Sequence, residues 1–297
     1  MACGLFLLNK ESGMTSQSAV RRVSRLFGGE KAGHTGTLDP MAEGVLPILL
    51  GRAVKASEFL LCGEKKYVAH LRLGVRSDTE DITGEIISES DAIPNEDDVM
   101  LAIASMQGRS IQIPPMYSAI KIGGKKLYDL AREGKTVERE GRAIDIFEII
   151  GKRLSDTEYE IEVKCSKGTY IRTLCSDIGK KLGCGATMTS LCRCSAAGYS
   201  LDVAKTLGEI EAASDEERKS LIIPTEKLFA DKAEIVLAPF FARLARCGAP
   251  IYQRKIGTSF PVGEIVRISD EKGFFAIGEA VSLEDGEAIK PIRQFEI

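Results

Sequence analysis

The chain has 297 residues, of which 44% are hydrophobic and 28% are charged, a composition typical of a globular protein with one large and one small domain. Its apolar runs are too short to span a bilayer or to form a signal-peptide core, so we expect a cytoplasmic protein without membrane contact. Eight cysteines without a CxxC pair and only two histidines argue against the common zinc sites and predict reduced thiols.

The net charge of −3 is unevenly distributed along the chain. Residues 10–76 carry eleven Lys/Arg against six Asp/Glu, a local +5, whereas residues 202–234 carry nine acids against five bases, a local −4. A basic region beside an acidic one is consistent with a face that binds a polyanion. A solvated surface with chance clustering explains the same numbers, and charge alone slightly favours that interpretation.

Apolar periodicity predicts short helices and strands over the first 225 residues. In chain order, these are a strand at 4–8, a helix from Thr15 or Ser16 to Phe27, a loop at 33–41, a helix at 53–61, strands at 66–73 and 85–88, a helix at 99–106, a strand at 117–122, a helix at 127–132, strands at 143–150 and 159–165, and helices at 173–182 and over most of 202–225. We expect residues 85–88 to pair with the strand at 66–73. Asn95 is a capping residue for its helix, and Gly183 ends another.

The last part of the chain has dense turn signals. Gly and Pro recur between short apolar segments such as residues 264–268 and 274–277. This spacing predicts a small all-β barrel over residues 230–297.

Conventional catalytic motifs are absent from the sequence. There is no phosphate-binding glycine loop of the GxxxxGK[ST] or GxGxxG type and no nucleophile elbow. If the protein is an enzyme, a metal-free mechanism that uses a carboxylate is what remains.

The most informative segment is the loop at residues 33–40, GHTGTLDP. Its two glycines permit backbone conformations that other residues resist, and Pro40 favours an extended Asp39. The loop would then present an imidazole and a carboxylate, those of His34 and Asp39. The competing interpretation is that Asp39 caps a helix whose first residue is Pro40, and the residues alone favour it.

Five segments follow one another in a recognisable order. They are GHTGTLDPMAEGVL at 33–46, KKY at 65–67, PPMYSAIK at 114–121, KGTYIR at 167–172, and GCGA at 183–186 followed by Leu191 and Arg193. Together they resemble the signature motifs of the TruB family of tRNA pseudouridine synthases. One segment departs from the family pattern, because Asn9 and Glu11 stand where the family usually has Asp and Pro.

The resemblance implies an α+β fold. We expect residues 1–229 to form the pseudouridine synthase domain, a long mixed and mainly antiparallel sheet flanked by helices. Within it, residues 118–142 would be an insertion that closes over RNA. Residues 230–297 are similar to a PUA-like RNA-binding domain, which agrees with the barrel predicted from the turn signals.

The resemblance also implies a reaction, the conversion of uridine 55 in the T loop of tRNA to pseudouridine without metal or cofactor. Asp39 matches the catalytic aspartate, Arg172 the arginine that pairs with it, and Tyr67 the tyrosine that stacks on the flipped base. The other positions that match the family's substrate site are His34, which contacts RNA, and Tyr170 and Leu191, which line the uridine pocket. Lys121, Lys125 and Lys126 are candidates for phosphate contacts. The alternative is that they lie on a solvated hairpin without RNA contact.

The expected partner is the T stem-loop of tRNA, bound by a monomer that needs no other protein. One alternative is a guide-RNA-dependent synthase that acts on ribosomal RNA. Another is a non-catalytic protein that binds or folds tRNA on the same scaffold. A third is an unrelated glycosidase, which would need two catalytic acids, whereas only Asp39 stands out.

Overall fold

The computed structural model of the chain describes residues 2–60, 63–118 and 120–295. Its largest sheet has nine strands within these residues, in the order β1-β3-β12-β4-β11-β10-β7, with β2 beside β3 and β13 beside β12. The strands are β1 (Gly4–Lys10), β2 (Ala32–His34), β3 (Glu43–Leu50), β4 (Lys65–Leu73), β7 (Gly108–Gln112), β10 (Arg142–Arg153), β11 (Glu158–Cys165), β12 (Ala186–Ala196) and β13 (Tyr199–Ser200). All neighbours are antiparallel except β3 and β12, which pair in parallel. The prediction of a long mixed, mainly antiparallel sheet is confirmed.

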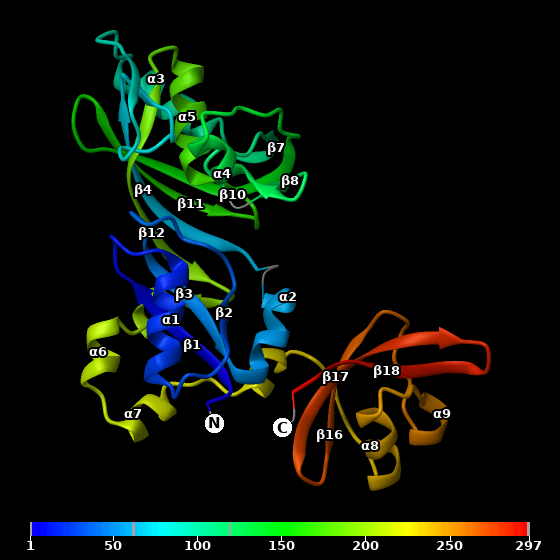
Figure 1. Cartoon of the computed structure of the whole chain (residues 1–297). Helices are drawn as coiled ribbons and strands as arrows, with labels where there is room; N and C mark the ends of the chain where they lie inside the picture. The colour runs from blue at the N-terminus through cyan, green and yellow to red at the C-terminus, as the bar shows by residue number, and fades with distance from the viewer. Residues whose placement is uncertain (1, 61–62, 119, 296–297) are drawn as a thin grey trace.

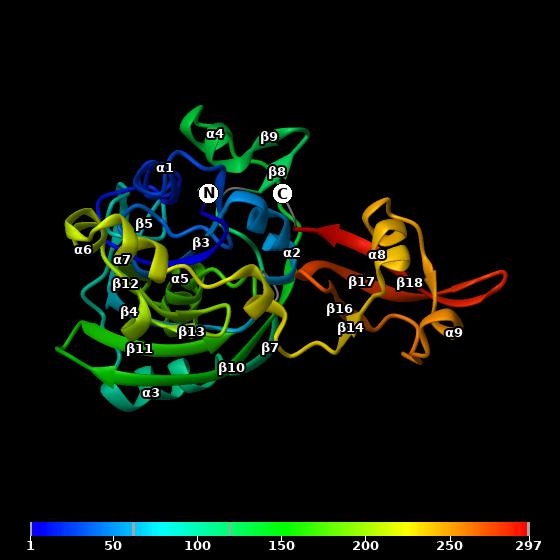
Figure 2. The ribbon, with the colours of Figure 1, turned by 90° about the horizontal axis from the view of Figure 1, so that it is seen from below.

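Helices flank this sheet, as Figure 1 shows. They are α1 (Ser16–Leu26), α2 (Ser57–Leu60), α3 (Glu96–Ala104), α4 (Leu127–Arg132), α5 (Ile171–Leu182), α6 (Leu207–Ala212) and α7 (Asp215–Ser220), with 3-10 turns η1 (Gly51–Ala56), η2 (Leu201–Val203) and η3 (Thr225–Phe229). α5 packs against β12, and α3 packs against β10. In Figure 2, α3 lies below β10. The predicted caps are confirmed, since the side chains of Thr15 and Asn95 accept hydrogen bonds from the first turns of α1 and α3, and Gly183 ends α5 with φ 79°.

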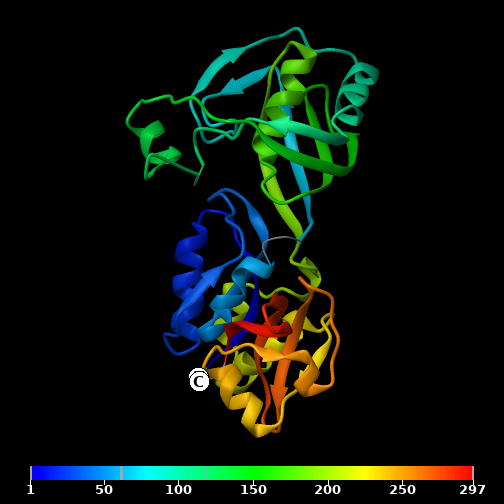
Figure 3. The same cartoon turned by 90° about the vertical axis from the view of Figure 1, so that its right-hand side faces the viewer.

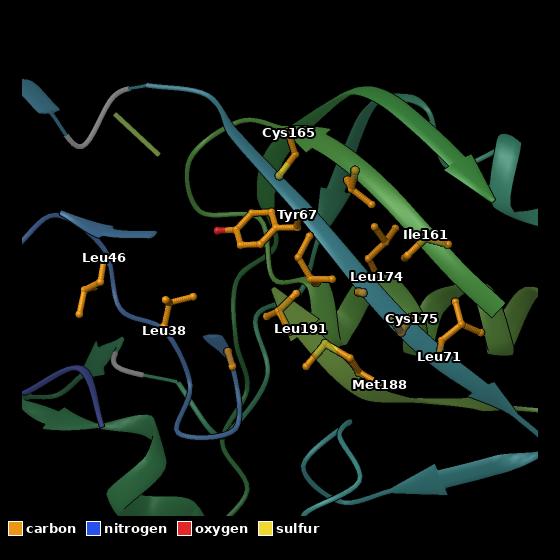
Figure 4. Packing of buried hydrophobic residues seen from close by; sticks show 14 of the residues in the cluster. Leu38, Leu46, Tyr67, Leu71, Ile161, Cys165, Leu174, Cys175, Met188 and Leu191 are labelled. Atoms are coloured by element: carbon orange, nitrogen blue, oxygen red, sulfur yellow. The ribbon is translucent and has the colours of Figure 1, made fainter. Parts of the chain in front are cut away.

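The alternating residues of β4 form the centre of the core. Tyr67, Ala69, Leu71 and Leu73 are each at most 7% exposed, and they pack with buried residues of β11, β12 and α5 in one cluster, part of which Figure 4 shows. Burial of one large apolar side chain stabilises a fold by about 1.5–3 kcal/mol. The alternation of β4 therefore reflects the burial of one of its two faces against the core.

Several predicted elements differ from the structure. β6 (Ile86–Glu89) pairs with β5 (Val75–Ser77) and not with β4, because β11 and β12 already occupy both edges of β4. The strand predicted at 117–122 shrinks to β8 (Lys121–Ile122), which pairs with β9 (Lys125–Lys126). Strands β3, β7 and β12 were not predicted. The prediction that residues 202–225 are mainly helical is confirmed, since η2, α6, α7 and the start of η3 cover most of them.

The end of the chain forms a second sheet beside the first. Its order is β14-β16-β17-β18-β15. The strands are β14 (Glu234–Val236), β15 (Ile251–Tyr252), β16 (Ile265–Asp270), β17 (Gly273–Leu283) and β18 (Gly286–Gln294), and the helices beside them are α8 (Pro239–Arg246) and α9 (Gln253–Ile256). The prediction of a C-terminal sheet is confirmed, although it was wrong in omitting α8 and α9, and closure into a barrel stays a prediction. The ring of Phe229 contacts the rings of Phe59, Phe274 and Phe295. Aromatic packing therefore links α2 and η3 to the C-terminal sheet.

No helix in the described part of the chain combines the length and the apolar character that a bilayer crossing requires.

Candidate active site

Asp39 lies in the loop that joins β2 to β3. No helix follows it: the backbone N–H of Ala42 donates to the Asp39 carbonyl at 3.1 Å, which closes a turn, and β3 begins at Glu43. The interpretation of Asp39 and Pro40 as a helix start is therefore wrong.

The segment between β1 and α1 holds this loop in place. Ser16 Oγ donates to the Leu38 carbonyl and accepts from the Leu38 N–H, both at 2.8 Å. The backbone N–H of Gly13 donates to the Pro40 carbonyl at 2.8 Å. Hydrogen bonds on both sides of Asp39 thus fix the backbone from which its carboxylate projects.

Lys10, at the end of β1, is a second anchor of the loop. Its side chain is fully buried, and Nζ donates to the carbonyls of Ala42 at 2.6 Å, Glu11 at 3.0 Å and Pro40 at 3.3 Å. Burial lowers the pKa of Lys10 to about 8, against the opposing effect of the Asp39 carboxylate. A lysine this deeply buried is rare unless it is fully hydrogen-bonded.

Arg172 pairs with Asp39 from the first turn of α5. Its Nε lies 2.8 Å from Asp39 Oδ2, and its Nη2 donates to Oδ1 at 3.3 Å. The arginine side chain is 5% exposed, whereas the aspartate side chain is 32% exposed. The guanidinium thus orients the carboxylate, which stays accessible to a substrate on its open side.

The two terminal nitrogens of Arg172 also donate hydrogen bonds to backbone carbonyls. Nη1 donates to the Thr79 carbonyl at 2.9 Å, Nη2 donates to the Tyr117 carbonyl at 2.8 Å, and Asp81 Oδ2 lies 3.7 Å from Nη1. Asp81 is 4% exposed, and one of its oxygens accepts hydrogen bonds from Thr79 Oγ1 at 2.9 Å and from the Thr83 N–H at 2.9 Å. Arg172 therefore ties together three loops and two carboxylates.

Tyr67 and Leu191 lie in the core on the paired strands β4 and β12, where Leu191 is opposite Ala69 and Tyr67 is opposite Arg193. Tyr67 and Leu191 are 7% and 6% exposed and belong to one cluster that also contains Leu38. Figure 4 shows the Tyr67 hydroxyl directed away from Leu71, Leu174 and Ile161, to the side on which Leu38 and Leu46 lie. Burial raises the pKa of Tyr67. Both residues are core residues in this structure, and both lie beside the loop that carries Asp39.

His34 and Tyr170 flank the same region. His34 lies on β2, where its Nδ1 accepts from the Gly36 N–H at 3.3 Å, and burial, together with the charge of Arg193, lowers its pKa. Tyr170 precedes α5, and its backbone is clamped by the Gln112 amide, which accepts from the Tyr170 N–H at 2.8 Å and donates to its carbonyl at 3.0 Å. Gln112 thus fixes the start of the helix that carries Arg172.

The predicted phosphate-binding lysines lie in the segment that contains β8, β9 and α4. Lys125 is exposed, whereas the side chains of Lys121 and Lys126 lie outside the described residues. Figure 3 shows this segment extending on the side of the molecule where the β2–β3 loop lies. Its first residues already touch the site through the Tyr117 carbonyl on Arg172.

Comparisons with known proteins agree with this geometry. The model of the TruB family pseudouridylate synthase N-terminal domain matches residues 24–171, and that of the tRNA pseudouridylate synthase B C-terminal domain matches residues 172–230. Proteins named tRNA pseudouridine synthase B from Alkaliphilus oremlandii and Clostridium tetani are both 42% identical over 277 residues, which cover 93% of this chain and 92% and 95% of theirs. This chain belongs to the TruB family. A chain from the crystal structure of a Cbf5-Nop10-Gar1 complex superposes with a TM-score of 0.72 at 26% identity, covering 99% of this chain and 85% of that one.

The motif comparison did not single out two residues of this TruB-family site. Asp81 stands in the turn-rich stretch between β5 and β6, where no periodicity marks a functional side chain. Lys10 reads as an ordinary surface lysine, because lysine is among the residue types least often buried. In both cases the sequence marks only a nearby turn or motif. The contacts with Arg172 and with the Asp39 loop are what place these two residues in the site.

Lys10 leads to a prediction about pH. Below about pH 8 its ammonium can donate to all three carbonyls, and above that pH the neutral amine keeps only two N–H groups. We expect the turnover of the wild-type enzyme to fall as the pH rises through about 8, and Lys10→Arg to move this fall to higher pH. The measurement is kcat from about pH 6 to pH 10 for both proteins.

Unfolding is a separate effect with the opposite sign. Because the pKa of Lys10 is lower in the folded chain, the unfolded chain binds more protons between pH 8 and pH 10.5, and the contribution of this group to stability increases over that interval. If the fall in kcat occurs at the same pH in Lys10→Arg as in the wild type, deprotonation of Lys10 is not its cause. Thermal denaturation at each pH serves as the control.

Proposed function

We propose that this TruB-family enzyme converts uridine 55 in the T loop of tRNA to pseudouridine. The observation that carries the proposal is the Asp39–Arg172 pair, in which a partly exposed carboxylate is held by a buried guanidinium. The 42% identity to proteins named tRNA pseudouridine synthase B supports the choice of substrate.

The reaction is an isomerisation that adds nothing to the substrate. The bond between N1 of the base and C1′ of the ribose breaks, the base turns, and a bond from C5 to C1′ forms. The proton on C5 leaves and N1 takes up a proton, so the atoms balance without a cofactor. Asp39 would act on the sugar as a nucleophile or as a base.

The target base must leave its stack before it reaches Asp39. Extrusion costs a few kcal/mol, and stacking on an aromatic ring returns about 1–3 kcal/mol per base. Tyr67 is the ring that we assign to this stacking, with Tyr170 and Leu191 as the walls of the uridine pocket and His34 as a contact to the RNA. Since Tyr67 is only 7% exposed, the base can reach its face only if the side chains around it move apart.

The rest of the chain would hold the RNA. We assign residues 1–229 to catalysis, residues 118–142 to closure over the T arm, and residues 230–297 to a PUA-like RNA-binding domain. Lys125 is exposed on β9 and would contact phosphate, together with Lys121 and Lys126.

The test is tritium release from 5-tritiated uridine in a bare T-arm transcript. Release in proportion to enzyme turnover is the expected result, because C5 loses its hydrogen when it bonds to the sugar. The matched control is the same transcript with cytidine at position 55, which should release nothing from that position. Release from the control, or none from the target transcript, would contradict the proposal.

The same transcript, which contains no guide RNA, distinguishes an enzyme that acts alone from one that depends on a guide RNA. We propose that the chain acts as a monomer in the cytoplasm, without a guide RNA or protein partner. The higher identity to the named tRNA synthases than to the Cbf5 chain, 42% against 26%, favours this reading. Turnover that appears only after a guide RNA is added would overturn it, and light scattering reports the mass in solution.

A glycosidase is less well supported. Asp81 supplies a second carboxylate near Arg172, but it is 4% exposed and accepts hydrogen bonds from neighbouring threonines. A glycosidase needs both acids open to the sugar, and only Asp39 has an open side.

Salt dependence gives a further prediction for the RNA interface. We expect affinity for the T arm to fall steeply between about 50 and 200 mM salt, by about 10³-fold for six phosphate contacts. The measurement is filter binding across that range. Lys125→Ala should lower the slope by about one phosphate contact, and a flat salt response would exclude a phosphate-dominated interface.

A further inference from the structure

Arg193 lies in the short parallel pairing of β3 with β12 in the large sheet. It lies on β12, where it is paired in parallel with Gly44 of β3 and antiparallel with Tyr67 of β4. The β3–β12 pairing comprises only two residue pairs, and Arg193 belongs to one of them. Its side chain is 1% exposed, and it is the largest of the fully buried side chains.

The guanidinium of Arg193 joins both ends of the loop that carries Asp39. Nη2 donates to the Gly36 carbonyl at 3.1 Å, three residues before Asp39, and Nε donates to the Val45 carbonyl at 2.7 Å, six residues after it. One planar side chain thus spans the loop from within, in addition to the contacts that Lys10 makes.

The backbone of the loop is shaped to accept Arg193. Gly44 has φ +104°, and a Cβ there would lie 2.3 Å from the carbonyl oxygen of Arg193; Gly36 has φ +137° and sits against Nη1. Only glycine adopts such angles at low cost. Gly44 therefore lets the main chain of the loop approach the backbone of Arg193, and Gly36 supplies the backbone angle needed at the other end of the loop.

The charge of Arg193 is not matched by a neighbouring carboxylate. Among residues 2–60, 63–118 and 120–295, no salt bridge within 4.0 Å involves it, in contrast to Arg172. Burying a charge costs several kcal/mol. If Arg193 had only a structural role, a neutral residue could fill the same position without that cost. Arg193 is paired across the sheet with Tyr67. Burial raises the pKa of Tyr67, and the nearby Arg193 charge opposes this effect.

We propose that Arg193 is a positioning residue that fixes the Asp39 loop relative to Tyr67 while a base enters between them. The inference rests on the proposed function, because it gives Arg193 a part in that reaction. Arg193 does not touch the reacting atoms. It keeps the carboxylate and the stacking ring at a set separation by holding the loop's two ends and the neighbouring strand.

Replacement of Arg193 should therefore affect the chemical step more than RNA binding. A misplacement of about 1 Å at a reacting centre can lower a rate about 100-fold. For Arg193→Met we expect the single-turnover rate constant to fall about 100-fold, while the Kd for the T arm stays within about threefold. Arg193→Lys keeps the charge but cannot hold two separated carbonyls in one plane, and we expect it to recover only a small part of the rate.

Arg218 provides a matched control. It donates from Nε to the Ile210 carbonyl at 2.7 Å and from Nη2 to the Glu211 carbonyl at 3.0 Å, the same two-carbonyl pattern, on α7 and away from the site. Arg218→Met should leave kcat at the wild-type value. A fall equal to that of Arg193→Met would show that a general loss of stability, and not positioning, explains the result.

The outcomes separate this inference from the proposed function. An inactive wild-type enzyme on the T arm contradicts the proposed function, whereas an active wild type with unchanged kcat in Arg193→Met overturns only the inference. If the affinity for the T arm fell in parallel with kcat, the inference would be overturned as well, because Arg193 would then contribute to RNA binding. If Arg193→Met fails to fold, Arg193→Lys decides: wild-type kcat overturns the inference, and a low kcat with an unchanged Kd supports it.

Discussion

Asp39→Asn is expected to remove turnover, by at least about 10³-fold, while leaving affinity for the T arm within about tenfold. Asparagine keeps the size of the side chain and one acceptor oxygen but has neither the charge nor the basicity to act on the sugar. The fold should survive, because Arg172 remains bonded to two backbone carbonyls and close to Asp81. The measurements are tritium release, filter binding and Tm on the same protein.

The control for Asp39→Asn is a second arginine–aspartate pair. Arg246 Nη2 lies 2.9 Å from Asp270 Oδ2 in the C-terminal sheet, so Asp270→Asn removes the same charge from the same kind of pair. Wild-type turnover is expected for that variant. Unfolding of Asp39→Asn would instead assign the carboxylate to holding the loop, and unchanged turnover would exclude it from the chemistry.

Arg172→Met is expected to damage both catalysis and stability. The change leaves Asp81 buried at 4% exposure without its cation, and removing one partner of a buried pair destabilises a protein by about 3–5 kcal/mol. At about 2–4 °C per kcal/mol for a domain of 150–250 residues, Tm should fall by roughly 6–20 °C. Turnover should be lost even at temperatures where the variant is folded, because Asp39 is no longer oriented.

A conservative variant and a double variant sharpen this test. Lysine carries a point charge and cannot reach both carboxylates and both carbonyls at once, so Arg172→Lys should recover part of Tm but little turnover. Arg172→Met combined with Asp81→Asn should recover stability relative to the single variant, because the unpaired buried charge is gone. If the double variant is less stable still, Asp81 is not the source of the loss.

The elements with strong local signals were predictable. β4 alternates because it is buried on one face only, and α1, α3 and α5 carry capping residues that act within one turn. β3 was missed because seven of its eight residues are buried, so a continuous apolar run with a proline replaces the alternation. β12 was missed because bulges at 188/190 and 193/195 interrupt its period.

The site was predictable only in part, and for a different reason. The residues alone favoured Asp39 as a helix cap, and the motif order, not the local physics, directed attention to Asp39, Tyr67 and Arg172. Asp81 and Arg193 contact the site from segments distant in the sequence. No local pattern records a contact that depends on strand order, which is why only the structure places them.

Asp39 and Arg172 belong to opposite halves of the large sheet. The loop of Asp39 lies beside β1, β2 and β3, whereas Arg172 starts α5, which packs on β12 and against α3. β4 and β12 run between the two halves as a two-stranded ribbon (Figures 1 and 3). Bending of that ribbon would change the distance between the Asp39 carboxylate and the Arg172 guanidinium. The charged pair therefore opposes any separation of the two halves of the sheet at this point.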